Sequence, residues 1–441
     1  MGGFRKVNLR TLRDSFGKSL IAKNSAWMLM GHCVRIGLQA VYFVMIARLL
    51  GADGYGAVVG VAALACIFAP FASFGSGNIL IKNVARDPTT FARYWGMALV
   101  ITFVSAGVLI TAVLAMARFT LPASISWSLV LTFAVAELLF GRLLDLAGQA
   151  FQAFQRLHRT AQFQMTMSVT RVGAVLLLST GMVKATPEAW GAFYLVSTAI
   201  STIVALWLVH RELGRPDFSA VRECLELRQG FYFSVSLSAQ NIYNDIDKTM
   251  LARYSTLDAT GIYGAAYRLI DIAMTPVRSL LYSAYAKFFQ HGESGVRGSL
   301  AFARRFVPTA SGYGLFAALA LWFGVPVVSL VLGREFERTI EATRWLALLP
   351  FLKTLHYFGA DTLTAAGHQG LRSGIQVVVA VFNVLVNLWI IPIYSWRGAA
   401  WSSLASDGLL AVLVWAAVWW LVRNAPPVLV IVVPPCEGAK D

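Results

Sequence analysis

The chain has 441 residues, of which 57% are hydrophobic and only 13% are charged, and its mean hydropathy is +0.64. An ordinary soluble domain is about half apolar and about a quarter charged, so this composition excludes a soluble globular protein. The formal net charge is +15, but the bases lie mostly in short stretches between apolar segments, which argues against a nucleic-acid-binding protein.

The N-terminal segment, residues 1–24, is basic. Leu9, Leu12, Phe16 and Leu20 would share one helical face with bases between them. This pattern is typical either of an amphipathic helix on an anionic membrane surface or of a solvated basic tail. A long apolar run follows without a small-residue cleavage site, so we expect no cleaved signal peptide.

Apolar segments of roughly 20 residues recur from end to end, and each is long enough to cross a hydrocarbon core of about 30 Å. The predicted spans are 25–47, 56–81, 94–117, 124–146, 160–182, 188–209, 230–252, 261–286, 304–332, 340–366, 373–394 and 398–421. Pro308 and Pro326 are expected to kink or divide the ninth span. The sequence therefore predicts an all-α membrane protein with about twelve transmembrane helices.

Lysines and arginines are distributed unevenly between alternate loops. With the N-terminus in the cytoplasm, the inner loops and tails hold roughly three times as many as the outer loops, as the positive-inside rule requires. The outer set comprises Arg48, Arg118, Lys184, Arg253, Arg334, Arg338 and Arg397. We therefore expect both termini on the cytoplasmic side.

The longest loop, residues 210–229, divides the predicted helices into two sets of six. The expected organisation is a cytoplasmic basic amphipathic N-terminus over 1–24, an N-terminal six-helix bundle over 25–209, a cytoplasmic linker over 210–229, a C-terminal six-helix bundle over 230–422 and a C-terminal tail over 423–441. Ala47-Arg48 followed by Tyr55-Gly56-Ala57 is echoed by Ala252-Arg253 followed by Tyr263-Gly264-Ala265. Two such halves would be parallel repeats around a central site, an arrangement suited to alternating access.

Several motifs in both halves resemble a known family. They are Lys23 to Trp27, Ala47 to Gly56, Gly75 to Arg86, Gln152 to Arg156, Ala365 to Gly367, Asn387, Pro392 and Gly398 to Ala400. Together they resemble polysaccharide biosynthesis proteins, the Wzx-type O-antigen flippases of the multidrug/oligosaccharidyl-lipid/polysaccharide (MOP) exporter superfamily. The resemblance implies a MATE-like, V-shaped fold of two six-helix bundles related by a pseudo-twofold axis.

The resemblance also implies a function. The family's substrate class is an oligosaccharide linked to a lipid diphosphate of the undecaprenyl type, which is moved across the bacterial inner membrane for O-antigen, capsule or exopolysaccharide synthesis. Membrane lipids, and a polysaccharide polymerase or glycosyltransferases, are the partners that this role suggests. No nucleic acid and no cofactor is expected beyond a coupling proton or sodium ion.

Ionisable side chains at membrane depth are costly and normally face the interior of a bundle. In the first span His32, Arg35, Gln39 and Tyr42 fall on one helical face, and Arg35 is the first candidate for a site. The seventh and eighth spans carry similar polar stripes. These contain Gln240, Asn244, Asp245, Asp247 and Lys248 in the seventh span and Arg268, Asp271 and Arg278 in the eighth.

These stripes suggest two kinds of site. A guanidinium is a planar, permanently charged donor that suits phosphate oxygens. Candidate phosphate or glycan contacts are Arg35, Lys248, Arg268 and Arg278, with His32, Gln39, Gln240 and Asn244 beside them. Asp245, Asp247 and Asp271 are candidates for binding the coupling ion. The alternative is that Lys248 and Arg268 simply pair with Asp247 and Asp271, as buried ions must.

Other polar positions at membrane depth are interpreted as structural. Glu137, Arg142, Asp145 and Arg171 form a weaker cluster, in which Arg142 and Asp145 are expected to reach the interface. Lys353, Asp361, Asn383, Asn387 and Asp407 are expected to bridge helices. His356 and His368 have no partners at metal-ligand spacing, so we predict no metal site.

Two rival functions remain open. A MATE-like drug or cation antiporter would favour an acidic, aromatic cavity over a basic one. A membrane glycosyltransferase or polymerase would need a sizeable outer loop for its catalytic residues, whereas every predicted outer loop is short. A phosphate-binding Walker sequence is absent as well, so we expect a transporter that is not an enzyme and is not driven directly by ATP.

Overall fold

The computed structural model describes residues 9–85, 87–154, 156–219, 227–292 and 294–424. In the first helix the side chains are described from Ile36 onward. The predicted site residues His32 and Arg35 therefore lie outside the described side chains.

The first half of the chain is built from helices, some of them broken. They are α1 (Leu9–Phe68), η1 (Ala69–Ala72), α2 (Ser76–Val84), η2 (Pro88–Thr90), α3 (Phe91–Thr120), α4 (Trp127–Ala134), η3 (Val135–Phe140), α5 (Gly141–Ala153), α6 (Leu157–Ser179) and α7 (Pro187–Glu212). Phe133 and Trp190 are among the large side chains buried in the apolar core of this half.

The second half is also helical. Its elements are α8 (Leu227–Tyr254), α9 (Leu257–Ala273), α10 (Thr275–Gly292), α11 (Gly295–Gly324), α12 (Pro326–Leu332), η5 (Arg334–Phe336), α13 (Thr339–Leu346), α14 (Leu349–Ala365) and α15 (Gln369–Asn424). Phe288 and Phe358 lie in a separate apolar core. The first core also takes in Ala252, Ala265, Leu332 and Phe336 of the second half, so the two halves share apolar packing where they meet.

Every predicted span coincides with helix in the structure. Two pairs of spans merge into one element each: α1 turns at Gly51, whose φ is 67°, and α15 turns at Ser395, whose φ is 55°. The predicted division of the ninth span is confirmed, because α11 ends at Gly324 and α12 begins at Pro326. Within the described residues, five helical stretches are long and apolar enough on their own to cross a membrane.

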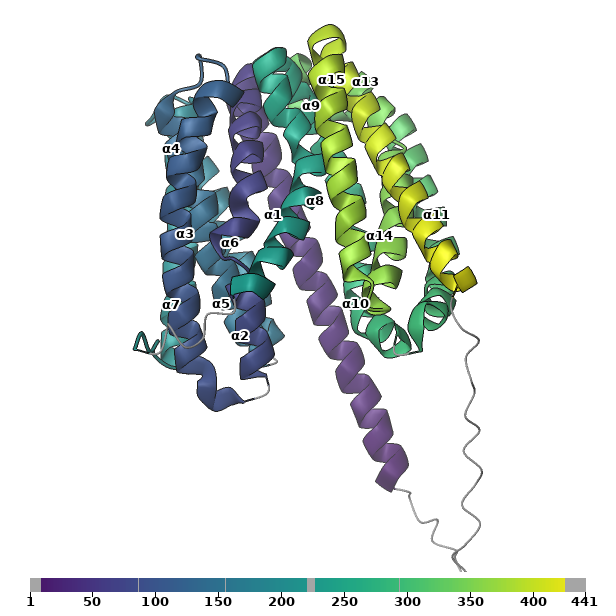
Figure 1. The fold of residues 1–441 in the computed structure, drawn as a ribbon. Helices are drawn as coiled ribbons and strands as arrows, with labels where there is room; N and C mark the ends of the chain where they lie inside the picture. Colours follow the sequence, from purple (N-terminus) through teal and green to yellow (C-terminus); the bar gives the residue numbers. More distant parts are fainter. Residues whose placement is uncertain (1–8, 86, 155, 220–226, 293, 425–441) are drawn as a thin grey trace, which may run out of the picture.

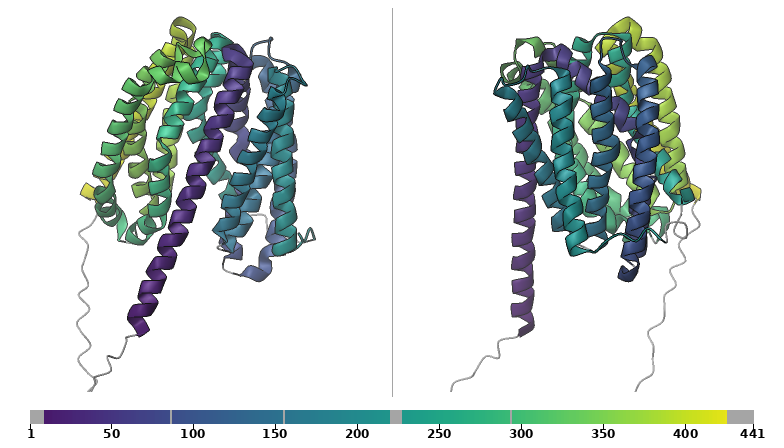
Figure 2. Two further views of the ribbon diagram at one scale, coloured as in Figure 1. Left: turned by 180° about the vertical axis from the view of Figure 1, so that it is seen from behind. Right: turned by 90° about the vertical axis from the view of Figure 1, so that its left-hand side faces the viewer.

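The two halves form the arms of a V (Figure 1). Helices α2 to α7 gather in the arm formed by the first half and α10 to α15 in the arm formed by the second half. On the inner sides, where the arms meet, lie α1 of the first arm and α8 and α9 of the second. The arms converge at one end of the molecule, the closed end, and diverge at the other, the open end. The first part of α1 runs between the arms and extends beyond them at the open end, as Figure 2 also shows. The predicted V-shaped, two-bundle fold is therefore confirmed.

Glycine allows the arms to cross closely at the closed end. A Cβ atom added at Gly56 of α1 would lie 1.8 Å from the carbonyl oxygen of Leu257, and one added at Gly261 of α9 would lie 2.0 Å from that of Ala52. Gly56 and Gly261 are 205 positions apart, and so are Ala52 and Leu257. The two halves therefore make the same contact with each other reciprocally, as a pseudo-twofold axis requires.

Two arginines at the same end repeat this reciprocity. Arg48 of α1 donates to the carbonyl oxygens of Val331 at 2.6 Å and Leu330 at 2.8 Å, at the end of α12. Arg253 of α8 donates to the carbonyl oxygen of Leu121 at 3.3 Å, directly after α3. The last carbonyls of a helix lack partners within the helix, so each arginine caps a helix of the opposite arm. We call these contacts the arginine clasps; they give the predicted Ala-Arg echo a structural role.

At the open end, the loop after α7 is tied to the start of α3. The backbone N–H of Asp217 donates to the carbonyl oxygen of Ala92 at 2.8 Å. Asp87 caps η2 by accepting the backbone N–H and the hydroxyl of Thr89, and these hydrogen bonds lower the pKa of the Asp87 carboxyl. The carboxylate form is therefore the one that stabilises this turn, and it is lost only in acid.

Candidate functional site

The polar stripe of α8 contains a buried cation that is already paired. The Lys248 ammonium contacts the Asp245 carboxylate and donates to the carbonyl oxygen of Asn244 at 3.0 Å. It also lies 4.1 Å from the centre of the Tyr267 ring, and the residue is only 7% exposed. Lys248 thus fits the predicted alternative of a structural ion pair, although its partner is Asp245 and not Asp247.

Asp247 faces away from Lys248 toward α9 and α15. One carboxylate oxygen accepts the Tyr263 hydroxyl at 2.5 Å and the Ser403 hydroxyl at 3.0 Å. The other accepts the backbone N–H of Lys248 at 2.8 Å. Asp247 is completely buried, and its described hydrogen bonds come from neutral donors. Among the side chains that the structure describes, this carboxylate joins three helices and forms no salt bridge.

Asp271 and Arg278 also pair with each other. Arg278 Nη2 donates to Asp271 Oδ1 at 2.7 Å, across the junction of α9 and α10. About half of the Arg278 side chain is exposed. The charge of this arginine is therefore matched locally, although its exposed edge still reaches solvent or ligand.

Arg268 of α9 differs from these cations. Among the described residues no carboxylate forms an ion pair with its guanidinium, and the predicted alternative of an Arg268–Asp271 salt bridge is not found. Its described contact is with α1 of the other arm: Nη2 lies 3.5 Å from the Tyr42 hydroxyl, and the guanidinium carbon lies 5.9 Å from the Tyr42 ring centre. Arg268 thus places a cation without a direct counterion at the seam between the arms.

A second network lies within the first arm. Arg171 Nη2 of α6 donates to the Tyr194 hydroxyl at 2.5 Å, and that hydroxyl donates to the Glu137 carboxylate. Glu137 itself lies 3.9 Å from Arg171, in the π-helical turn η3. Such turns are frequent at functional sites. The sequence identified Glu137 and Arg171 only as part of a weak cluster and did not single out Tyr194, because the convergence of the three residues depends on three separate helices.

Another deeply buried network lies in the second arm. Lys353 Nζ of α14 donates to Asn244 Oδ1 at 2.6 Å and lies 3.2 Å from Asp407 Oδ2 of α15. His356 Nε2 lies 2.9 Å from the other oxygen of Asp407. Lys353 and His356 are one turn apart on one helix, but no sequence signal links them to Asp407. The sequence analysis did not anticipate the pairing of His356 with Asp407, whereas the structural role that it gave to Lys353 and Asp407 agrees with this packing.

Two further predicted site residues are the glutamines Gln39 and Gln240. Gln39 of α1 and Gln240 of α8 are both partly exposed. In the second cluster, Arg142 pairs with Asp145 at 3.0 Å, and both side chains are partly exposed. Within the residues that the structure describes, no group of three potential ligands could hold a metal ion.

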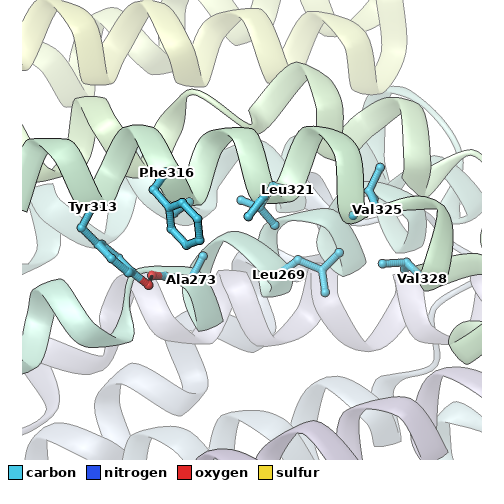
Figure 3. A pocket seen from close by; sticks show the side chains of 10 residues that line it. Leu269, Ala273, Tyr313, Phe316, Leu321, Val325 and Val328 are labelled. Atoms are coloured by element: carbon cyan, nitrogen blue, oxygen red, sulfur yellow. Dashed lines mark hydrogen bonds between the residues drawn. The ribbon is translucent and has the colours of Figure 1, made fainter.

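An apolar groove lies outside the charged region. It has a volume of about 300 Å³ and lies between α9, α11 and α12 (Figure 3). Leu269 and Ala273 line it from α9, and Tyr313, Phe316 and Leu321 line it from α11. The Tyr313 hydroxyl donates to the carbonyl oxygen of Ala273 at 2.9 Å, so the polar end of this ring is satisfied. The groove therefore offers an almost wholly apolar wall one residue along α9 from Arg268.

Residues 21–286 match the family described as polysaccharide biosynthesis protein. The chain belongs to this family. A curated relative, the "Probable low-salt glycan biosynthesis flippase Agl15" of Haloferax volcanii, is 21% identical over 399 residues, which cover 89% of this chain and 82% of the relative.

Solved structures share the fold at low sequence identity. An inward-facing multidrug resistance MATE transporter of the MOP superfamily superposes with a TM-score of 0.72 at 13% identity, covering 88% of this chain and 96% of that one. The lipid II flippase MurJ, in an inward closed conformation, gives a TM-score of 0.63 at 11% identity, covering 91% of this chain and 88% of MurJ. This family member therefore has a multi-pass membrane transporter fold, and its relatives are flippases and transporters, not enzymes.

Proposed function

We propose that this protein is a flippase that moves a lipid-diphosphate-linked oligosaccharide across the bacterial inner membrane during synthesis of a surface polysaccharide. The family concerns polysaccharide biosynthesis, and one relative is named as a glycan biosynthesis flippase. A structural neighbour is a flippase for lipid II. Sugar recognition is assigned to polar residues of the seam, such as Gln39 and Gln240.

The unmatched charge of Arg268 is the observation that carries this proposal. Lys248, Arg278 and Lys353 each have a carboxylate in direct contact, whereas Arg268 has none among the described residues. A buried or partly buried charge is unfavourable without a partner, so a site that keeps one at the meeting of two arms favours an anionic ligand. The diphosphate of a lipid-linked glycan supplies such an anion, whereas a drug-like cation does not.

The distribution of bases gives the proposed orientation. Figure 1 shows the end of α7 and the start of α11 at the open end, and Arg211 and Arg297 belong to these helix ends. Arg48 and Arg253 form the clasps of the closed end. By the positive-inside rule we place the open end, where α1 begins and α15 ends, on the cytoplasmic side. In this state the seam would load the glycolipid from the inner leaflet, and separation of the closed end would release it outward.

The lipid chain needs an apolar path while its head group is in the seam. The groove lined by Leu269 and Ala273 lies on the helix that carries Arg268. We therefore place the lipid chain against this outer face of α9, in the bilayer, and the diphosphate on the inner face.

We further propose that transport is coupled to a proton or a sodium ion. Asp245 and Asp271 are occupied by Lys248 and Arg278, so Asp247 is the predicted coupling residue that has no ion-pair partner among the described side chains. Transport by wild-type protein that is indifferent to both pH and sodium gradients would contradict this coupling.

A reconstituted system tests the function. Purified protein in liposomes is given a fluorescent undecaprenyl-diphosphate-linked oligosaccharide in both leaflets, and access of an external glycosidase to the label is followed over time. We expect complete digestion with the protein and about half without it, because the labelled lipid of the inner leaflet reaches the outside only when it is transported. Organic-cation uptake is measured in the same vesicles. Cation uptake without glycolipid movement would contradict the proposal and establish the drug antiporter.

A further inference from the structure

The turn between α12 and α13 brings two side chains of the second arm onto the first arm at the closed end. Phe336 of η5 is 1% exposed, and its ring meets the ring of Tyr55 of α1 edge-on, with the centres 6.2 Å apart. Beside it, the Glu335 carboxylate accepts the backbone N–H of Ala52 at 3.1 Å. Both contacts join the arms, so both end when the arms separate at this end.

Glu335 contacts the start of a helical segment. Because α1 turns at Gly51, Ala52 is the first residue of its second segment. The first N–H groups of a helix have no partners within that helix, and a carboxylate beside their partial positive charge is stabilising. Glu335 therefore supplies an N-terminal cap to α1 from the other arm.

The equivalent helix of the second arm has a cap of its own. Gly51 and Thr256 are 205 positions apart, the same separation as Gly56 and Gly261. Thr256 precedes α9 in an extended conformation, with φ −124° and ψ 156°, and its hydroxyl accepts the backbone N–H of Ala259 at 3.1 Å. Threonine is among the preferred residues at this position. This cap joins neighbouring residues, so it does not depend on how the arms are placed.

Gly51 cannot provide a cap of that kind. Its φ is 67° and its ψ is −179°, a backbone conformation that essentially only glycine adopts. A Cβ atom at this position would also lie 2.5 Å from Glu335 Oε2. The turn therefore excludes a capping side chain at position 51 and leaves room for one from the other arm. The pseudo-twofold symmetry of the closed end is broken at this pair of positions.

We propose that Glu335 is a conformational latch, which caps α1 only while the closed end is closed and so favours that state before any ligand is bound. When the arms separate there, α9 keeps its cap and α1 loses the one that Glu335 supplies. Opening of this end is therefore opposed by a contact of the chain itself. The inference goes beyond the proposed function, because it depends on separation of the arms and not on what is transported.

Labelling of a single cysteine tests the latch. Gln240→Cys is introduced into protein whose four native cysteines are replaced by serine, and its reaction with an impermeant maleimide added at the closed end is followed in liposomes without any glycolipid. We expect Glu335→Ala to raise the labelling rate about fivefold, as loss of an N-terminal cap would. Glu335→Gln should raise it only about twofold, because an amide oxygen still accepts the hydrogen bond but lacks the charge. An unchanged rate with Glu335→Ala would overturn the latch.

The matched control is Thr256→Ala. It removes the equivalent cap in the second arm, but that cap is present whether the arms are together or apart. We therefore expect Thr256→Ala to lower the free energy of unfolding and to leave labelling unchanged. Glu337→Ala removes an exposed carboxylate two residues from Glu335 and should also leave labelling unchanged. A rise with either control as large as that with Glu335→Ala would show that general stability or net charge controls this end, and would contradict the latch.

Discussion

The interior charges of this protein differ in what each one contacts. Lys353, His356 and Asp407 form a closed network in which every charged group has a partner, and Lys353 is 1% exposed. Such a network holds α14 against α15 and has no free donor for a ligand. Arg268 shares the same arm but contacts only the phenol of Tyr42 in the described structure. At the scale of single residues, interior charges that are paired with each other hold helices together, whereas the interior charge without an ion-pair partner is the candidate for binding a ligand.

The buried pair gives a stability prediction. Lys353→Met removes the ammonium beside Asp407 and leaves a buried carboxylate with His356 alone, so we expect a loss of about 3 kcal/mol or more of unfolding free energy. Adding Asp407→Asn to Lys353→Met should recover part of the loss, because no buried charge is then unpaired. The measurement is chemical unfolding in detergent.

A surface pair serves as its control. Arg397 donates to both oxygens of Glu341, but both side chains are about half exposed. Arg397→Ala should therefore reduce the free energy of unfolding by about 1 kcal/mol or less. Equal losses from Lys353→Met and Arg397→Ala would contradict the structural role of the buried network.

At the scale of helices, the closed end is held by contacts that occur twice. In the arginine clasps and in the glycine crossing, a residue of one arm contacts the other arm, and the equivalent residue of that other arm makes the matching contact in return. These contacts exist only while the closed end is closed, so weakening them should favour the opposite conformation without disturbing either core. These repeated contacts therefore identify the closed end as the part that must separate during transport, without reference to the candidate ligand site.

Removing both clasps should open this end. A single cysteine is introduced by Gln240→Cys in a background where the four native cysteines are replaced by serine. Its labelling by an impermeant maleimide added at the closed end is then measured. Each hydrogen-bonded arginine is partly exposed, so we expect about 1 kcal/mol from each, or about a fivefold rise in labelling for Arg48→Ala and again for Arg253→Ala.

The matched control for the clasps is Arg118→Ala. Arg118 lies in the last turn of α3 at the same end and is exposed. Because it is outside both clasps, its replacement should leave labelling unchanged. Labelling that rises as much with Arg118→Ala as with Arg48→Ala would show that net charge, and not the clasps, controls this end.

The glycine crossing makes a second prediction at this scale. Gly56→Ala and Gly261→Ala would each place a methyl group about 2 Å from a backbone oxygen of the other arm, so we expect each to reduce the free energy of unfolding by about 2 kcal/mol. In contrast, a Cβ at Gly173 of α6 would meet nothing within 4 Å. Gly173→Ala should stabilise by about 0.5 kcal/mol through helix propensity. The same sign for all three substitutions would contradict the close crossing.

For the molecule as a whole, much of the fold could be predicted from the sequence. Recurring apolar stretches of membrane length specified the spans, and Pro308 and Pro326 marked the segment that is divided. The stripes of α8 and α9 also indicated the correct helices for the candidate site. These signals are local, because hydropathy and helical periodicity depend only on neighbouring residues.

Pairing between distant residues could not be predicted in the same way. Lys248 meets Asp245 instead of Asp247, because Asp247 turns toward hydroxyls on α9 and α15. Arg171 meets Tyr194 and Glu137 only because α6, α7 and η3 converge. Which cation remains unpaired therefore depends on how helices far apart in the sequence pack together.

The account of the whole molecule depends on the charge of Arg268 at the seam. The most direct test is the translocation rate of an undecaprenyl-diphosphate-linked oligosaccharide in liposomes containing wild type, Arg268→Lys or Arg268→Ala. We predict that Arg268→Ala slows translocation at least tenfold, that Arg268→Lys retains an intermediate rate, and that Arg397→Ala matches wild type. Translocation at the wild-type rate by the Arg268→Ala variant would contradict the account.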